Sequence, residues 1–225
     1  MRLIICFKKS DNAKYISHLD LQRTVDRALR RSGVDVSYSE GFNPHIQMSF
    51  AFALKVGLMS DNEYLEVAVQ DSVDVLDAEK RIKESFPKGI EVNWVKKKKE
   101  NVKKLMASVA MARYDILIHQ PCDISKIKSA IDEILALDEM ILEKKTKKGT
   151  RTFDTRPLIY KLSVDEKNCK IDALLSAQQL DTLDPKLLFN KIMLVAEQNY
   201  EYTITRNNLY TIVDKKVYPL SFLAE

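Results

Sequence analysis

Cysteine is scarce in this chain of 225 residues: it occurs three times, as Cys6, Cys122 and Cys169. Three widely separated cysteines supply neither a disulfide framework nor a zinc knuckle, and they are typical of a reducing compartment. No closely spaced cysteine triplet is present to hold an iron–sulfur cluster. The chain is therefore not expected to carry out cluster chemistry alone.

Glycine and proline are also few, with five and six residues, which argues against long disordered stretches. No hydrophobic run approaches the roughly 20 residues that a membrane-spanning helix needs. The apolar stretch after Met1 is too short for a signal peptide and lacks a small-residue cleavage site. With 45% hydrophobic and 30% charged residues, the sequence predicts a cytoplasmic protein with a sizeable core and no membrane association.

The net charge is only +4, but the basic residues are unevenly distributed, with one run at 96–104 and another at 144–156. A charge run is either a solvated face or linker, or a surface that binds a polyanion such as RNA. Asp154, between Arg151 and Arg156, could organise a phosphate contact or belong to a surface Arg–Asp network. The candidate phosphate-binding residues are Arg23, Arg27, Lys97, Lys98, Lys147, Arg151, Asp154 and Arg156.

Local patterns predict the order β-α-β-β-α-β twice. In the first half we expect strands at 2–8, 34–38, 47–56, 63–69 and 90–95, and helices that begin at Ser17 and near Asp74. In the second half we expect strands at 114–119, 139–146, 157–164, 169–175, 200–206 and 209–213, and helices that begin at Asp123 and Asp184. The predicted fold class is α+β, with two tandem ferredoxin-like (βαββαβ) units that have antiparallel sheets, at 1–100 and 101–225.

Two polar clusters near the start of the chain mark the candidate site: Ser17-His18-Leu19-Asp20 and Tyr38-Ser39-Glu40-Gly41-Phe42-Asn43-Pro44-His45. His18 lies at the positive end of a helix dipole, which favours the neutral imidazole that accepts a proton or binds a metal. The alternative is a partly buried core histidine. Asp20 fits a capping box, whereas Glu40 has no evident structural duty.

We expect the second cluster to form a loop that packs over the first turn of the helix and brings His18 and His45 to one concave surface. Gly41 supplies a turn that a side chain would forbid. Phe42 is either a core anchor for the loop or an exposed stacking face for a base. The candidate catalytic residues, for acid–base work on a ribose hydroxyl, are His18, Asp20, Glu40 and His45, and the candidate metal ligands are His18, Glu40 and His45.

The two clusters, with Arg27-Ala28-Leu29-Arg30-Arg31-Ser32-Gly33 between them, resemble a bacterial family known as radical-SAM-linked proteins. The similarity continues through Ser49-Phe50-Ala51, Glu63-Tyr64-Leu65-Glu66 and Asp154-Thr155-Arg156-Pro157 to Arg206-Asn207-Asn208-Leu209-Tyr210. Members are domains of unknown function that occur as free chains or fused behind a cobalamin-binding radical SAM protein. Where that family has a second proline after the loop histidine, this chain has Ile46.

The resemblance implies a partnership with a separate radical SAM enzyme, which would carry S-adenosylmethionine and the iron–sulfur cluster. Members of the family are encoded near RNA-processing and ribosomal genes. We therefore expect an RNA-binding or substrate-presenting accessory protein that acts in RNA modification or processing and binds no cofactor itself. The alternative is an RNA-acting enzyme that uses His18 and His45 for cleavage or modification, with or without a metal.

Overall fold

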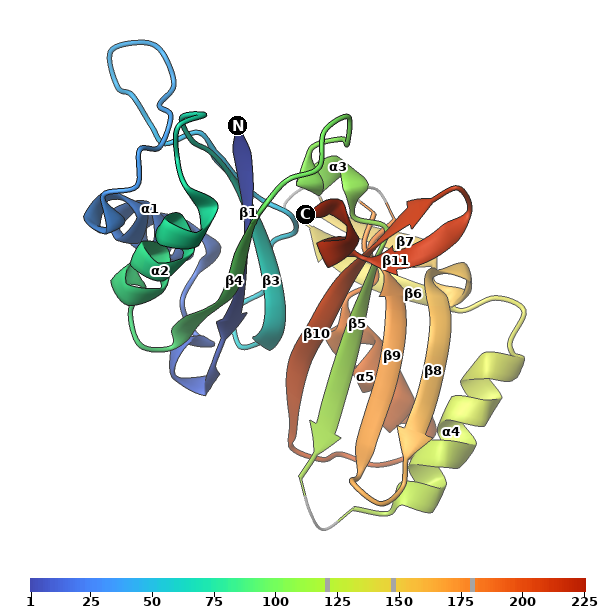
Figure 1. Ribbon diagram of the computed structural model, residues 1–225. Helices are drawn as coiled ribbons and strands as arrows, with labels where there is room; N and C mark the ends of the chain where they lie inside the picture. The colour runs from blue at the N-terminus through green and yellow to red at the C-terminus, as the bar shows by residue number, and fades with distance from the viewer. Residues whose placement is uncertain (120–121, 147–148, 179–180) are drawn as a thin grey trace. The chain divides into compact units, whose positions relative to one another are not determined.

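The computed structural model describes residues 1–119, 122–146, 149–178 and 181–225 (Figure 1). They form two compact units: the first contains Met1–Ala110 and Arg206–Glu225, and the second contains Met111–Thr205. The fold is mixed α+β, and each strand pair for which the structure defines the residue register is antiparallel. The elements are β1 (Arg2–Lys9), η1 (Asp11–Ala13), α1 (His18–Ser32), β2 (Met48–Phe50), β3 (Met59–Ala68), α2 (Val75–Ser85), β4 (Ile90–Lys97), α3 (Leu105–Ser108), β5 (Met111–Ile118), α4 (Ile124–Ala136), β6 (Ile141–Thr146), β7 (Gly149–Asp154), η2 (Arg156–Leu158), β8 (Ile159–Asp165), β9 (Lys170–Ser176), α5 (Pro185–Val195), β10 (Tyr202–Val213), β11 (Lys216–Pro219) and η3 (Leu220–Leu223).

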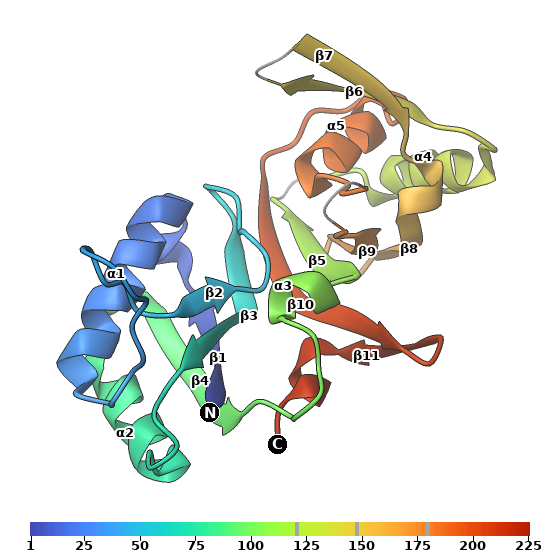
Figure 2. The same cartoon turned by 90° about the horizontal axis from the view of Figure 1, so that it is seen from above.

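In the first unit, β1 lies between β3 and β4, and β2 pairs with β3. Figure 2 shows α1 and α2 together on one side of these strands. Leu21, Val25 and Leu29 face this sheet because they recur every three or four residues along α1. There they join Leu3, Ile5 and Phe7, the alternate residues of β1, in one buried core.

Local capping signals set the ends of α1. The Ser17 hydroxyl accepts a hydrogen bond from the backbone N–H of Asp20, as the capping box predicts. At the other end Gly33 adopts a left-handed conformation with φ of 62° and donates its N–H to the carbonyl of Arg30. The expected helix is therefore confirmed, and it fixes the register of the side chains discussed below.

The last twenty residues return to the first unit. Asn62 donates its side-chain amide to the Asn207 carbonyl at 2.9 Å, and the Tyr64 hydroxyl donates to Asn208 Oδ1 at 2.6 Å. Further along, the N–H of Glu225 donates to the Lys97 carbonyl at 2.8 Å. These bonds correct the expected division at residue 100, because Arg206–Glu225 complete the first unit rather than the second.

In the second unit β5 pairs with β9, and β9 pairs with β8. Helices α4 and α5 begin at Asp123 and Asp184, whose carboxylates cap them as predicted. Strands β6 and β7 form a separate two-stranded sheet. Strand β7 was not expected, since the predicted strands at 139–146 and 157–164 leave Gly149–Asp154 between them.

Three other strand expectations need correction. Residues 34–38 form no regular strand and make only isolated bridges at Val36 and Tyr38. The strand expected at 47–56 is confined to β2, Met48–Phe50. The two strands expected at 200–206 and 209–213 are one continuous strand, β10.

Candidate nucleic-acid interface

A groove with a volume of about 420 Å³ follows the polar face of α1. Arg23, Arg27 and Arg30 reach the same side of the helix because they are four and three residues apart. We call this surface the α1 groove; its lining residues are Gln22, Arg23, Asp26, Arg27, Arg30, His45, Ile46 and Met48. It combines three guanidinium groups and an imidazole on one surface, all within the first unit.

The three arginines of the α1 groove differ in their ion pairs. Arg30 binds Asp26 through two N–H groups at 2.7 and 3.3 Å, and Arg23 contacts Asp20 at 3.3 Å. For Arg27, which is exposed, no ion pair occurs among the described residues. The groove therefore keeps a net positive charge and one guanidinium available for a bidentate contact with phosphate.

The loop at 39–45 is closed at its base and exposed at its tip. The N–H of Ser39 donates to the His45 carbonyl at 2.8 Å, and the N–H of His45 donates to the Ser39 hydroxyl at 3.0 Å. In Figure 1 the chain between α1 and β2 extends away from the sheet of the first unit. Its tip carries Phe42, whose relative exposure of 108% means that the ring contacts no core. The expected core anchor is therefore wrong, and the alternative of an exposed stacking face remains.

His18 occupies different surroundings. Its half-buried ring meets Phe50 edge-on, with 5.2 Å between centroids, and its Nδ1 is buried with no hydrogen-bond partner among the described residues. Burial lowers the pKa of His18 below its usual value near 6.5, and Glu63 opposes this shift. His45 lines the α1 groove and His18 does not, so this groove does not hold both histidines.

The carboxylates of Asp20 and Glu40, which were expected beside these histidines, have different surroundings. Asp20 accepts a hydrogen bond from the Ser17 hydroxyl at 2.7 Å and contacts Arg23, so it stabilises the first turn of α1. Glu40 lies exposed in the loop. Among the described residues, no group of three His, Cys, Asp or Glu side chains is placed to hold a metal ion, and the expected ligand set of His18, Glu40 and His45 is therefore not assembled.

In the second unit, Asp154 and Arg156 have structural partners. Asp154 Oδ1 accepts from the N–H of Met140 at 2.9 Å and of Arg156 at 3.0 Å. The Arg156 guanidinium donates to the Leu135 carbonyl at 2.9 Å. Both side chains thus hold the segment between β7 and β8. Lys147 and the side chain of Arg151, also expected to bind phosphate, lie outside the described residues.

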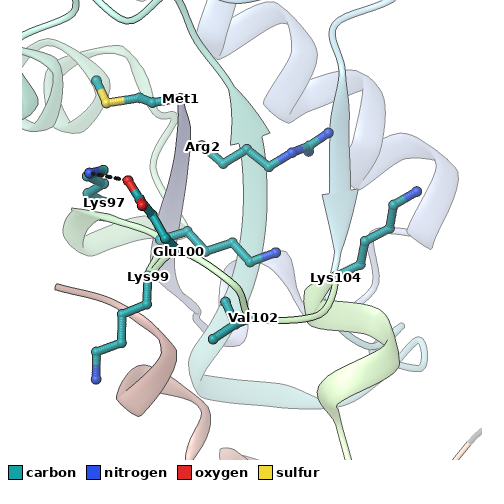
Figure 3. A pocket seen from close by; sticks show the side chains of 8 residues that line it. Met1, Arg2, Lys97, Lys99, Glu100, Val102 and Lys104 are labelled. Carbon is teal, nitrogen blue, oxygen red and sulfur yellow. Dashed lines mark hydrogen bonds and ion pairs between the residues drawn. The ribbon is translucent and has the colours of Figure 1, made fainter.

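A second concave surface lies around the end of β4. Its volume is about 340 Å³, and we call it the lysine pocket (Figure 3). It includes Lys97 and Lys98, both candidate phosphate-binding residues, and Lys104 from the basic run at 96–104, whereas Arg2 was missed. Arg2 lies near these lysines because β1 pairs with β4, which no local pattern reveals. The lining residues are Met1, Arg2, Lys97, Lys98, Lys99, Glu100, Val102 and Lys104.

A buried cluster of charges in the first unit was not expected from the sequence. Arg206 is 1% exposed and Glu63 is 3% exposed, and they form an ion pair. Lys9, 1% exposed, donates to the carbonyls of Lys14 and Ile16 at 3.2 Å each. Burial lowers the pKa of Lys9, and Glu63 opposes that shift. These groups hold the interior together and leave no accessible reactive atom, since all three side chains are enclosed.

Comparison with known proteins gives one family and one fold. Residues 2–185 match a family described as "Uncharacterized protein conserved in bacteria (DUF2344)". No curated protein matches the chain. A chain from "Crystal Structure of a Cbf5-Nop10-Gar1 Complex" is similar in fold, with a TM-score of 0.50 and 12% identity over 92% of this chain and 48% of that chain. The present chain thus spans about half the length of that solved chain. Among the described residues, no helix has both the length and the apolar character needed to cross a bilayer.

Proposed function

The chain belongs to the bacterial family DUF2344, and we propose that it is an RNA-binding accessory protein that works with a separate radical SAM enzyme in RNA modification or processing. The RNA part rests on the α1 groove, which His45 lines, and on the exposed ring of Phe42, three residues earlier in the same loop. Arginines supply the phosphate contacts that dominate nucleic-acid affinity. An uncovered aromatic ring supplies a platform on which an unpaired base can stack.

This combination favours single-stranded RNA or an RNA loop. Proteins that read RNA sequence mostly bind unpaired bases, because the grooves of an RNA duplex expose little sequence information. The ring of Phe42 is fully exposed at the loop tip, where it is accessible to an unpaired base for stacking. The bonds between Ser39 and His45 close the base of the loop, and His45 lines the α1 groove.

The RNA proposal is tested by measuring the affinity of an unstructured RNA for Arg27→Gln and Phe42→Ala across a salt series. Arg27→Gln should reduce the slope of log affinity against log salt by about 0.7, the value for one phosphate contact with a single strand. Phe42→Ala should weaken binding by about 1–3 kcal/mol without changing that slope.

Matched controls come from the same unit. Arg31→Gln removes an exposed arginine of α1 that does not line the groove, and Leu76→Ala removes an apolar side chain that is 78% exposed. Both should bind RNA like the unaltered protein. If the protein fails to bind tRNA, rRNA fragments or unstructured RNA even at low salt, the RNA proposal is wrong.

The partnership with a radical SAM enzyme rests on the resemblance carried by the motifs at 17–20 and 38–45. Affinity capture of the tagged protein from its native cell, followed by mass spectrometry, should enrich a radical SAM protein over an unrelated tagged bait. If RNA is captured without any radical SAM protein, the proposed RNA binding is supported and the proposed partnership is wrong. The alternative of an RNA-acting enzyme with His18 and His45 as acid and base gains no support from a groove that only His45 lines.

We also infer that each unit is a variant of the ferredoxin-like plan. The sheet of the first unit has the order β4-β1-β3, with β2 beside β3. In the second unit the strands follow the order β5-β9-β8, and β10, of which Tyr202–Thr205 belong to this unit, lies beside β5. In both cases the first and third strands of a βαββαβ unit are adjacent and its last strand lies beside the first, which is the arrangement that this plan requires.

A further inference from the structure

We propose that the lysine pocket binds a dianionic phosphate group, such as the phosphorylated end of an RNA strand or a free nucleotide. This inference goes beyond the proposed RNA binding, because the pocket and the α1 groove share no residue. Figure 3 shows its side chains arising from β1, from the end of β4 and from the segment that leads into α3. Those segments all belong to the first unit.

The floor of the lysine pocket holds more positive than negative charge. Glu66, which is 0% exposed, contacts both Lys98 at 2.8 Å and Arg2 at 3.4 Å. One carboxylate therefore balances two cations. Lys98 and Glu66 are buried, whereas the side chain of Arg2 is 39% exposed, so the second cation remains accessible to an approaching anion.

The ammonium group of Lys98 has hydrogen-bond donors available for a ligand. Its side chain is 7% exposed, and its ammonium group donates one hydrogen bond, to Glu66, among the described residues. An ammonium group carries three N–H donors. A buried donor without an acceptor costs free energy, so the two further donors of Lys98 fit a ligand with several acceptor oxygens in the pocket.

The rim of the pocket adds cations that are weakly held. Lys97 and Glu100 bend toward each other, with 3.5 Å between Nζ and Oε1 (Figure 3), and Lys97 lies 3.6 Å from Glu225. Lys104 is exposed and makes no ion pair among the described residues. In all, five side-chain cations line the pocket, and the three side-chain carboxylates on or beside it leave two positive charges in excess.

This excess selects the ligand class. A phosphate diester within a strand carries one negative charge, whereas a phosphate monoester carries about 1.5 to 2 at pH 7 and offers three acceptor oxygens. Lysine ammonium groups bind phosphate as point charges without demanding bidentate geometry. The monoester therefore matches both the charge and the donors of the lysine pocket, and a volume of about 340 Å³ accommodates it with part of the attached sugar.

The test compares two RNA oligonucleotides of one unstructured sequence, with a 5′-phosphate or a 5′-hydroxyl group, and adds titrations with AMP and inorganic phosphate. The phosphorylated RNA or AMP should bind about tenfold more tightly than its unphosphorylated counterpart, the 5′-hydroxyl RNA or adenosine, as expected for added charge-assisted hydrogen bonds. The double variant Lys99→Gln/Lys104→Gln should abolish that preference. Lys103→Gln, an adjacent exposed lysine that does not line the pocket, is the matched control and should retain it.

The outcomes distinguish a free nucleotide from an RNA strand end as the source of the phosphate. They also distinguish phosphate binding in the lysine pocket from RNA binding in the α1 groove. Saturable AMP binding that is lost in the double variant identifies a nucleotide ligand, and a 5′-phosphate preference without AMP binding identifies a strand end. Either result supports the lysine pocket even if the α1 groove fails to bind RNA. Arg27→Gln should lower the affinity for both RNAs equally and leave their ratio unchanged. The inference is overturned if the protein prefers neither the 5′-phosphorylated RNA nor AMP over its unphosphorylated counterpart. It is also overturned if Lys99→Gln/Lys104→Gln keeps such a preference.

Discussion

The ion pair between Glu63 and Arg206 predicts a large loss of stability when either charge is removed. Their side chains are 4% and 1% exposed. Arg206 donates from Nε to Glu63 at 2.8 Å, and its NH2 group donates to the Phe52 carbonyl at 2.9 Å. Glu63→Gln keeps the shape of the side chain and removes its charge. We expect it to lower the free energy of unfolding of the first unit by about 3–5 kcal/mol, because it leaves a buried guanidinium without a counter-charge.

Trp94 is the single tryptophan of the chain and a residue of β4, so its fluorescence reports on the first unit alone. Its ring lies 5.9 Å from that of Tyr64. Unfolding in urea followed at Trp94 therefore gives the stability of this unit without requiring both units to unfold together. The control is Glu79→Gln, the same chemical change at a partly exposed ion pair with Lys83, where we expect less than about 1 kcal/mol.

A double-mutant cycle distinguishes the charge from the packing. Arg206→Met alone leaves Glu63 buried and unpaired, whereas Glu63→Gln/Arg206→Met removes both charges. We expect the double variant to be more stable than the sum of the single losses indicates, with a coupling of roughly 2–3 kcal/mol. Additive single effects, or a loss below about 1 kcal/mol for Glu63→Gln, would refute the reasoning.

Two further predictions use the same fluorescence assay. Ser17→Ala should lower the stability of the first unit by about 1 kcal/mol, because the N–H of Asp20 loses its acceptor. Ser17→Thr should lose much less stability, since it keeps the hydroxyl. Equal losses in both variants would count against the cap. Because burial lowers the pKa of His18 in the folded state, the unfolded chain takes up the proton first, so stability should fall as the pH is lowered from about 7 to about 5. His18→Phe should flatten that part of the profile, and an unchanged slope would show that another group is responsible.

Features governed by neighbouring residues could be predicted from the sequence. Ser17, Asp74, Asp123 and Asp184 all cap helices where expected, since a cap depends on three or four consecutive residues. The apolar stripe of α1 also packs as its spacing indicates. Arg23 and Arg27, two of the candidate phosphate-binding residues, both line the α1 groove.

Features that depend on distant segments could not be predicted in this way. Asn207 and Asn208 interrupt the apolar pattern of β10 and resemble a turn, yet they continue the strand because Asn62 and Tyr64 bind them. A core anchor was one of the two alternatives for Phe42, because phenylalanine side chains are usually buried, but its ring is fully exposed. For Asn207 and Asn208, tertiary contacts overrode local preference.

The buried carboxylates of β3 show most clearly what local patterns omit. Charged residues in a strand ordinarily mark a solvent face. Glu63 and Glu66 lie on opposite faces of β3, because they are three residues apart, and both are buried. Glu66 binds Lys98 and the N–H of Leu105, where the chain is about to leave the first unit. Glu63 binds Arg206, where the chain re-enters it. Through these two glutamates, β3 binds the chain both where it leaves the first unit and where it returns to it. Loss of either carboxylate should therefore weaken the packing of Arg206–Glu225 or of the segment near Leu105 against the first unit.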